Sequence, residues 1–164
     1  MTELYPRMDE QDIIEIKKII NARLTMHRYP VILEWGAGDS TIIFSNFLKD
    51  LRFMHNQQHP FQWYSIENSL DWIDKVKKEK NEFVTLINKS LDSKEYIEPK
   101  IGYVNLVIID GRRRVECAQH AKRWLVKGGY VLIHDADREK YHEAFKLFKD
   151  GKFLTKTLWR GTNG

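Results

Sequence analysis

Hydrophobic positions along the chain follow two patterns, one typical of helices and one typical of buried strands. Ile13, Ile16, Ile20 and Leu24 recur at helical spacing, which predicts an amphipathic helix over residues 9–24. Short apolar runs between polar or glycine-containing segments predict strands. The predicted strands cover residues 31–35, 63–67, 83–87, 104–110, 130–134 and 153–159; the other predicted helices cover residues 41–51, 69–78, a segment ending near 126, and 138–149.

Strands and helices alternate along the chain, which is the pattern of an open α/β sheet. The runs at 31–35, 104–110 and 130–134 are almost continuously apolar, as expected for parallel strands covered by helices on both faces. We therefore expect a single domain over residues 1–164, built as a doubly wound, mostly parallel sheet. Residues 1–28 are expected to form an N-terminal helix or lid.

The C-terminal residues predict an incomplete sheet. Residues 153–159 supply one strand and residues 160–164 are typical of a turn, so we expect a truncated C-terminal hairpin. Phe153, Leu158 and Trp159 would then add apolar surface to an exposed strand edge. This edge predicts a symmetric homodimer. The alternative is a monomer in which the strand folds back beside residues 130–134.

Composition limits the class of protein. The chain has 164 residues, 42% of them hydrophobic, and a formal net charge of +4. No apolar run approaches the roughly 20 residues that span a bilayer. The first residues lack the basic start and apolar stretch of a signal peptide. Cys117 is the single cysteine, which excludes an intramolecular disulfide and, with the preceding points, predicts a cytoplasmic protein without a membrane partner.

Acidic residues end four of the predicted strands. Glu34, Glu67, Asp110 and the pair His134-Asp135 follow or close strands 1, 2, 4 and 5. The carboxyl ends of parallel strands meet at one edge of a sheet, where ligands of open α/β folds bind. We therefore expect these side chains to surround one site.

A glycine loop follows the first of these strands. Gly36-Ala37-Gly38 lets a ligand approach the backbone closely, and the helix beginning near Thr41 directs its first amides toward the same place. The third glycine of the dinucleotide fingerprint is replaced by Thr41, which argues against NAD or FAD. The alternative reading is a tight turn between strand and helix.

Four segments in order resemble one family. Residues 34–41, EWGAGDST, resemble motif I of the class I S-adenosylmethionine (SAM)-dependent methyltransferases, and residues 65–67, 108–112 and 125–132 resemble its motifs at strands 2, 4 and 5. The resemblance covers residues 31–160. It implies a Rossmann-like fold, SAM as the cofactor and the small-molecule, O-methyltransferase-like branch of the family.

The resemblance also implies residue roles. Gly36, Ala37 and Gly38 would pass under the methionine part of SAM, Glu34 would lie near its amino group, and Glu67 would accept hydrogen bonds from both ribose hydroxyls. The full implied cofactor-binding set is Glu34, Gly36, Ala37, Gly38, Ser40, Glu67, Asn68, Ser90 and Asp110. Alternatives are that Glu67 caps the next helix and that Ser90 is an ordinary loop serine.

Candidate catalytic residues are Asp110, His134 and Asp135. An oxygen nucleophile must lose its proton. A general base can remove it, or a bound metal can lower the pKa of the hydroxyl. His134 has the pKa range of a base, although a histidine bonded to backbone is the alternative. Asp110, Asp135 and Asp137 would be the ligands of Mg²⁺, as in the catechol-type and macrolide-type O-methyltransferases that this segment resembles. The alternative is helix capping by Asp135 or Asp137.

Three consecutive arginines, residues 112–114, occupy a predicted helix N-terminus, where the helix dipole disfavours cations. Arg112 and Arg114 are therefore candidates to clamp an acidic substrate. Arg114 pairing with Glu116 or Asp110 is the alternative. His55 and His59 have a spacing that suits zinc, but no further ligands cluster around them, and a solvated loop is the favoured interpretation.

Three functions remain open on the sequence. The first is a methyltransferase for a small, acidic acceptor. The second is an RNA ribose methyltransferase, suggested by the net positive charge; the segment at 110–113, DGRR, lacks the (N/D/S)-P-P-(Y/F/W) motif of enzymes that methylate base amines, and nucleic acid is the less favoured partner. The third is a SAM-binding module without turnover.

Overall fold

The computed structural model describes residues 7–57 and 59–164, so the expectation about a signal peptide falls on residues outside this part. The elements are α1 (Glu10–Leu24), β1 (Val31–Trp35), α2 (Asp39–Met54), β2 (Gln62–Glu67), α3 (Leu70–Glu79), β3 (Val84–Asn88), α4 (Lys94–Ile97), β4 (Val104–Ile109), α5 (Arg114–Trp124), β5 (Leu125–Ile133), the 3-10 helix η1 (Glu139–Leu147), β6 (Lys149–Phe153) and β7 (Trp159–Thr162). Among the described helices, none has the length and apolar character needed to cross a membrane.

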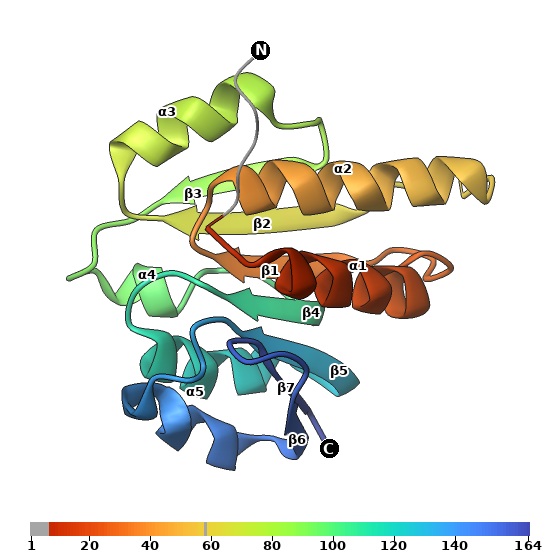
Figure 1. Ribbon diagram of the computed structural model, residues 1–164. Coiled ribbons are helices and arrows are strands. Elements are labelled where there is room, and N and C mark those ends of the chain that lie inside the picture. The colour runs from red at the N-terminus through yellow and green to blue at the C-terminus, as the bar shows by residue number, and fades with distance from the viewer. Residues whose placement is uncertain (1–6, 58) are drawn as a thin grey trace.

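The strands form a seven-stranded sheet in the order β3-β2-β1-β4-β5-β7-β6 (Figure 1). The first five strands are parallel, and β7 is antiparallel to both β5 and β6. The chain crosses from the β3 edge to β4, which lies on the other side of β1. This places the topological switch point, where open α/β sheets bind ligands, between β1 and β4.

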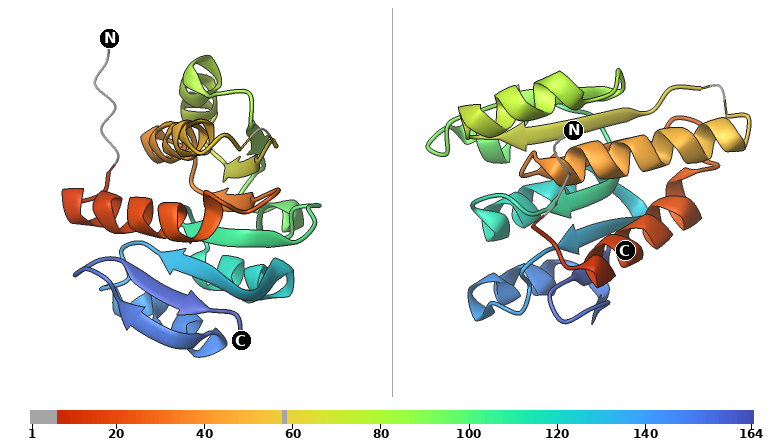
Figure 2. Two further views of the ribbon diagram at one scale, coloured as in Figure 1. Left: turned by 90° about the vertical axis from the view of Figure 1, so that its right-hand side faces the viewer. Right: turned by 45° about the horizontal axis from the view of Figure 1, so that its top comes forward.

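Helices cover both faces of the sheet, as the sequence predicts (Figure 2). On one face, α1 and α2 bury Ile16, Ile20 and Leu48 against the strands. On the other, α5 and η1 bury Ala118 and Ala144. Two apolar layers therefore hold the parallel strands and align their carboxyl ends along one edge.

One predicted boundary moves because of sheet pairing. α5 ends at Trp124 and β5 begins at Leu125, although the glycines at 128 and 129 suggested that the strand begins at 130. Leu125 already pairs with Val104, and the register shifts before Leu106 pairs with Tyr130. The glycines therefore lie within a bulged strand, where Gly128 has a φ of +75°.

The predicted strand over residues 153–159 and the truncated hairpin are wrong. β6 ends at Phe153, residues 154–158 turn back, and β7 begins at Trp159, so both strands of the hairpin are present. The prediction failed because the turn is apolar: Leu158 is fully buried and its carbonyl accepts the amide of Leu154 at 2.8 Å. As in the monomer alternative, the last strand folds back beside β5.

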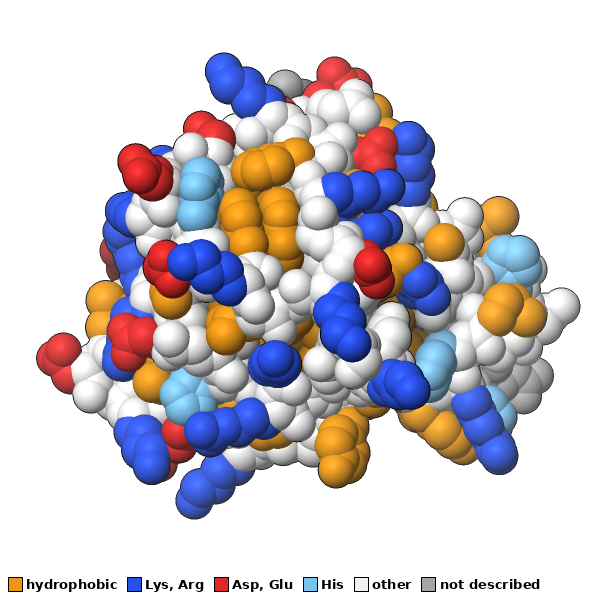
Figure 3. Space-filling view, turned by 90° about the horizontal axis from the view of Figure 1, so that it is seen from below, with side chains coloured by type: hydrophobic (Ala, Val, Ile, Leu, Met, Phe, Trp, Pro, Cys, Tyr) orange, Lys and Arg blue, Asp and Glu red, His pale blue; other side chains and the backbone are white. Residues whose placement is uncertain are grey.

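The homodimer prediction named three apolar residues, of which Leu158 and Trp159 are buried and Phe153 is 46% exposed on β6. Trp159 is buried and stacks on Phe145 with ring centroids 4.3 Å apart, so it offers no surface to a second chain. The outer strand is β6, whose residues Lys149 and Lys152 are exposed. Lysines on an edge strand disfavour strand-to-strand association. Figure 3 looks onto the side of the molecule that carries β6 and η1 and shows Lys and Arg side chains distributed across it.

Candidate functional site

A cavity of about 570 Å³ lies where β1, β2, β4 and β5 end. Its walls come from the segments after these strands, within residues 36–40, 67–72, 110–114 and 134–141, and from Arg7 before α1. In Figure 1 this is the side toward which the parallel arrows point. As predicted, Glu34, Glu67, Asp110 and the pair His134-Asp135 lie at one edge of the sheet, where the parallel strands end.

Glu34 lies beneath the glycine loop and outside the cavity wall. It is fully buried and accepts hydrogen bonds from Ser40 (2.8 Å), Thr41 (2.7 Å), Trp63 (3.0 Å) and Ser65 (2.9 Å). Burial raises the pKa of Glu34, and the four hydrogen bonds oppose that rise. Its carboxylate therefore fastens the start of α2 to β1 and β2, a supporting position where the resemblance implied a contact with the cofactor.

The two glycines of the loop have different reasons to lack a side chain. Gly36 has a φ of +101°, and a Cβ there would lie 2.9 Å from the carbonyl carbon of Asp110. A Cβ on Gly38 would meet only the ring of Trp72 at 3.6 Å, an ordinary contact distance. Gly36 thus serves the packing of the protein, whereas Gly38 keeps space open at the cavity. Ala37 and Ser40 also line the cavity.

Glu67 lies at the cavity and also bonds the backbone just before the next helix. It is 8% exposed, lines the cavity, and accepts the amides of Asn68 (2.8 Å) and Ser69 (2.7 Å) at Oε1. Burial raises the pKa of Glu67, while these amide hydrogen bonds and the charge of Arg112 lower it. The amides before α3 therefore hold a buried carboxylate against the cavity, beside Asn68, which also lines it.

His134 links two carboxylates. Its Nδ1 lies 2.8 Å from Oδ1 of Asp110, and its Nε2 lies 3.1 Å from Oδ2 of Asp12 in α1. Burial lowers the pKa of His134, but the hydrogen bond and charge of Asp110, with the charges of Asp135 and Asp12, raise it more, so the net shift is upward. Both ring nitrogens are engaged, in contrast to the predicted role of a free base.

Arg114 ties the ends of β4 and β5 together. The guanidinium is buried and donates to the carbonyls of Gly111 (2.9 Å), Asp110 (3.1 Å) and His134, and to Oδ2 of Asp135 (3.0 Å). It also lies 3.5 Å from Oδ1 of Asp110. These contacts agree with the alternative of pairing to a nearby acid, and they leave Arg114 a structural cation in the cavity wall.

The neighbouring arginines differ from Arg114. Arg112 is exposed and lines the cavity, and its amide donates to the Tyr96 hydroxyl at 3.0 Å. Arg113 has a φ of +52°, pairs with Glu116, and donates to the carbonyl of Leu91 at 2.8 Å. Arg112 is therefore the member of the triplet whose charge is available to a ligand.

The predicted magnesium site does not assemble. Asp137 is exposed and lies outside the cavity wall. Asp110, His134 and Asp135 do converge, with possible ligand atoms within 4.8 Å of one another. However, Arg114 already supplies a cation between the two carboxylates, and a ring nitrogen of His134 occupies Oδ1 of Asp110. These contacts do not fit a divalent ion, because Arg114 or His134 already contacts an oxygen of each carboxylate and the charge of Arg114 would repel the ion.

Two further predicted positions fall outside the cavity. Ser90 is exposed in the segment after β3 and does not line it. His59 lines a separate cavity of about 380 Å³ at the other end of the sheet. Among the described residues, His55 and His59 join no group of three possible metal ligands.

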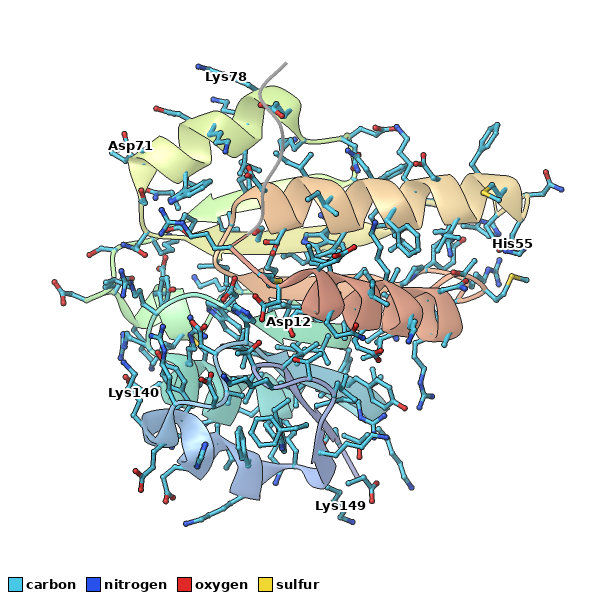
Figure 4. All side chains as sticks on the ribbon, in the orientation of Figure 1. Asp12, His55, Asp71, Lys78, Lys140 and Lys149 are labelled. Atoms are coloured by element: carbon cyan, nitrogen blue, oxygen red, sulfur yellow. The ribbon has the colours of Figure 1, made fainter. Side chains whose placement is uncertain are left out.

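The sequence reasoning missed Asp12, Trp72 and the cations Arg138 and Lys140. Trp72, Arg138 and Lys140 line the cavity, and Lys140 is labelled in Figure 4 on the side where the parallel strands end. Asp12 precedes Ile16 by four residues, so the helical spacing already placed a carboxylate on the apolar face of α1. A charge on that face was a signal that it has a buried partner.

Comparison with solved structures shows which fold this is. A methyltransferase-like protein from Silicibacter pomeroyi aligns with 98% of this chain and 90% of its own, at a TM-score of 0.66 and 14% identity. Precorrin-6y C5,15-methyltransferase from Geobacter metallireducens aligns with 100% of this chain and 92% of its own (TM-score 0.64, 13% identity). The chain has the fold of the class I methyltransferases.

A third structure of this fold contains a cofactor product. An RNA methyltransferase from Salinibacter ruber, in complex with S-adenosyl-L-homocysteine, aligns with 96% of this chain and 93% of its own, at a TM-score of 0.59 and 16% identity. No family model and no curated protein matches the sequence. At these identities, the class I methyltransferase fold is what the solved structures and this chain share.

Proposed function

We propose that this protein is a SAM-dependent methyltransferase that acts on a small, acidic acceptor. The observation that carries the proposal is Glu67, a buried carboxylate held against the cavity beside a glycine loop at the switch point of this fold. An ionised carboxylate accepts hydrogen bonds from two donors at once, which suits the vicinal hydroxyls of a ribose. The S-adenosyl-L-homocysteine held by the Salinibacter ruber neighbour supports SAM as the ligand.

The residues present fit this cofactor. Gly38 keeps open a space that a larger side chain would fill, and Ala37, Ser40 and Asn68 complete that wall of the cavity. When bound, SAM supplies an electrophilic methyl group. The role of the chain is to bind and orient both ligands, because alignment of two reactants removes about 7–11 kcal/mol from the barrier.

The charges around the cavity favour an acidic acceptor. Arg112 and Lys140 line the cavity, and the described residues give neither a carboxylate within ion-pair distance. Lys140 instead lies 5.0 Å from the ring centroid of Tyr141, another lining residue. Arg138 also lines the cavity, 3.6 Å from Oδ2 of Asp135. Cations facing a cavity attract a carboxylate or phosphate group.

Calorimetric titration with SAM and with S-adenosyl-L-homocysteine tests the cofactor. We expect the parent protein to bind SAM in the micromolar range and Glu67→Gln to bind about 10- to 100-fold more weakly, since hydrogen bonds to a charged group contribute about 1.5–3 kcal/mol. Glu82→Gln, a change at an exposed glutamate that does not line the cavity, should bind SAM as the parent does. Equal affinities for the parent and Glu67→Gln would contradict the proposal.

The acceptor class is tested on the complex with S-adenosyl-L-homocysteine, using benzoate and benzamide, which match in shape and differ in charge. We expect benzoate to bind more tightly, and the double variant Arg112→Gln/Lys140→Gln to remove that preference. Equal binding of the two probes would exclude the acidic acceptor while leaving SAM binding untouched. Binding of SAM without methyl transfer to any acidic acceptor would indicate a binding module.

A further inference from the structure

Asp12 is a fully buried carboxylate that the proposed function does not use. Its exposed fraction is 0%, although it lies in the first turn of α1, close to the start of the described chain. It accepts hydrogen bonds from Thr157 (2.7 Å) and Thr155 in the turn between β6 and β7, and it lies 3.1 Å from Nε2 of His134. Figure 4 labels Asp12 beside the start of α1, next to the strand ends.

A fully buried carboxylate is costly unless it is paired with a cation. The groups that face His134 are Asp12 from α1, Asp110 after β4 and Asp135 after β5, with Arg114 of α5 bonded to the His134 carbonyl. Arg138 also lies 3.6 Å from Oδ2 of Asp135, so with a neutral imidazole three carboxylates would share the two positive charges of Arg114 and Arg138. With an imidazolium, the charges of the cluster balance, and each ring nitrogen donates to a carboxylate.

The remaining oxygen of Asp110 is the one available to a ligand. Both contacts of the Asp110 side chain, with His134 at 2.8 Å and Arg114 at 3.5 Å, join Oδ1. The residue lines the cavity, and its side chain is 20% exposed. His134 therefore orients the Asp110 carboxylate through one oxygen and leaves Oδ2 for the cavity.

We propose that Asp12 is a positioning residue that holds His134 as an imidazolium, so that the Asp110 carboxylate is oriented to receive a proton from the acceptor. This role rests on the proposed methyl transfer. The step assigned to the chain is a proton transfer: the acceptor's X–H bond breaks, its electron pair stays on X, and a new O–H bond forms at Asp110. His134 keeps both of its protons throughout.

The arrangement explains why α1 belongs to the site although only Arg7, just before it, lines the cavity. Asp12 connects the helix, the β6–β7 turn and the end of β5 at one carboxylate. The upward shift in the pKa of His134, which its carboxylate neighbours cause against the effect of burial, agrees with the imidazolium form.

NMR titration of the histidine ring nitrogens tests the proposal on the protein without any ligand. The His134 signals are identified by their loss in His134→Gln. We expect His134 in the parent to be protonated at pH 7, with a midpoint above the ordinary histidine value of about 6.5. Asp12→Asn should lower that midpoint by about 1–3 pH units, because an opposite charge in contact shifts a pKa by that amount.

Thr157→Val is the matched control, since it removes a hydrogen bond to Asp12 and keeps the charge of Asp12. The midpoint of His134 in this variant should stay above the ordinary histidine value of about 6.5. A neutral His134 at pH 7 in the parent would overturn the proposal without any need for a variant, and so would an unchanged midpoint in folded Asp12→Asn. If Asp12→Asn does not fold, the titrations of the parent and Thr157→Val decide.

A second readout separates the failure of this inference from that of the proposed function. Asp12→Asn should bind SAM with the affinity of the parent, because Asp12 lies outside the cavity wall, and should lower kcat with little change in KM. If the parent protein does not bind SAM, the proposed function is wrong, whereas the titration result for His134 is unaffected. A kcat equal to that of the parent would contradict the positioning role alone.

Discussion

The backbones of Gly36 and Gly111 are in contact where β1 and β4 end, since a Cβ built on Gly36 would lie 2.8 Å from the amide nitrogen of Gly111. A Cβ on Gly111 would in turn lie 3.0 Å from the nitrogen of Gly36. Each loop therefore needs the other to lack a side chain. The contact brings the glycine loop and the Asp110 segment together at the switch point of the sheet, and it forms one corner of the cavity.

This contact separates two glycines that look equivalent in the sequence. Gly36→Ala should lower the free energy of unfolding by about 1–3 kcal/mol, because it adds a clash and a strained positive φ. Gly38→Val should leave stability close to that of the parent and abolish SAM binding, because its side chain occupies cavity space. Thermal unfolding and calorimetry measure the two effects. A Gly38→Val protein that binds SAM normally would contradict the assignment of the loop.

The titration of Glu34 should contribute to the pH dependence of the free energy of unfolding. Burial raises the pKa of Glu34 in the folded protein above its unfolded value, so the folded state holds its proton to higher pH. The contribution of Glu34 to stability is therefore fully present below the unfolded pKa and is lost as pH rises through the folded pKa.

Glu34→Gln removes that titration. As pH rises from 4 toward neutrality, the parent should therefore lose stability relative to Glu34→Gln, as measured by the free energy of unfolding of each protein. Urea unfolding at a series of pH values measures it. A difference that is constant with pH, or that moves in favour of the parent, would show that the Glu34 pKa is not raised.

Arg112 and Arg114 should differ sharply in their importance for folding. Arg114→Gln should cost about 3–5 kcal/mol of stability, since it leaves Asp135 and three backbone carbonyls without their buried cation. Arg112→Gln is the matched control, because Arg112 is exposed and forms no ion pair with the described residues, and it should change stability by less than about 0.5 kcal/mol. Equal stabilities for the two variants would contradict the structural role of Arg114.

Trp159 should prove to be a core residue of the C-terminal hairpin. Trp159→Ala should lower the free energy of unfolding by about 3–5 kcal/mol, because the indole packs on Phe145 and Phe148 and is 4% exposed. Phe153→Ala, at a residue that is 46% exposed on the edge strand, should cost much less. Chemical denaturation of the two variants compares them, and the reverse order of stability would contradict this hairpin packing.

The elements that sequence predicts well are those whose pattern is local. The strand at β4 and the helix at α1 follow from periodicity because each buries a continuous face, and the acidic rim follows because Glu67 and Asp110 end parallel strands. The β6–β7 hairpin was missed for a physical reason. Leu154 and Leu158 extend the apolar pattern of a strand, whereas the chain uses them to pack a turn into the core.

By itself the sequence determined the class of fold, the order of its elements and the carboxylates gathered at one edge, since residue spacing and strand direction decide these. Tertiary structure decided which of those groups remain available. The sequence suggests that Glu34 and Arg114 contact a ligand, but in the structure both side chains form their hydrogen bonds with other protein groups. Asp12 lies on the apolar face of the predicted helix, which indicates a buried partner, but only the structure shows that this partner is His134, 122 residues away. Such contacts depend on how α1 and the β6–β7 turn pack against β5, and no local sequence pattern shows which distant residues this packing brings together.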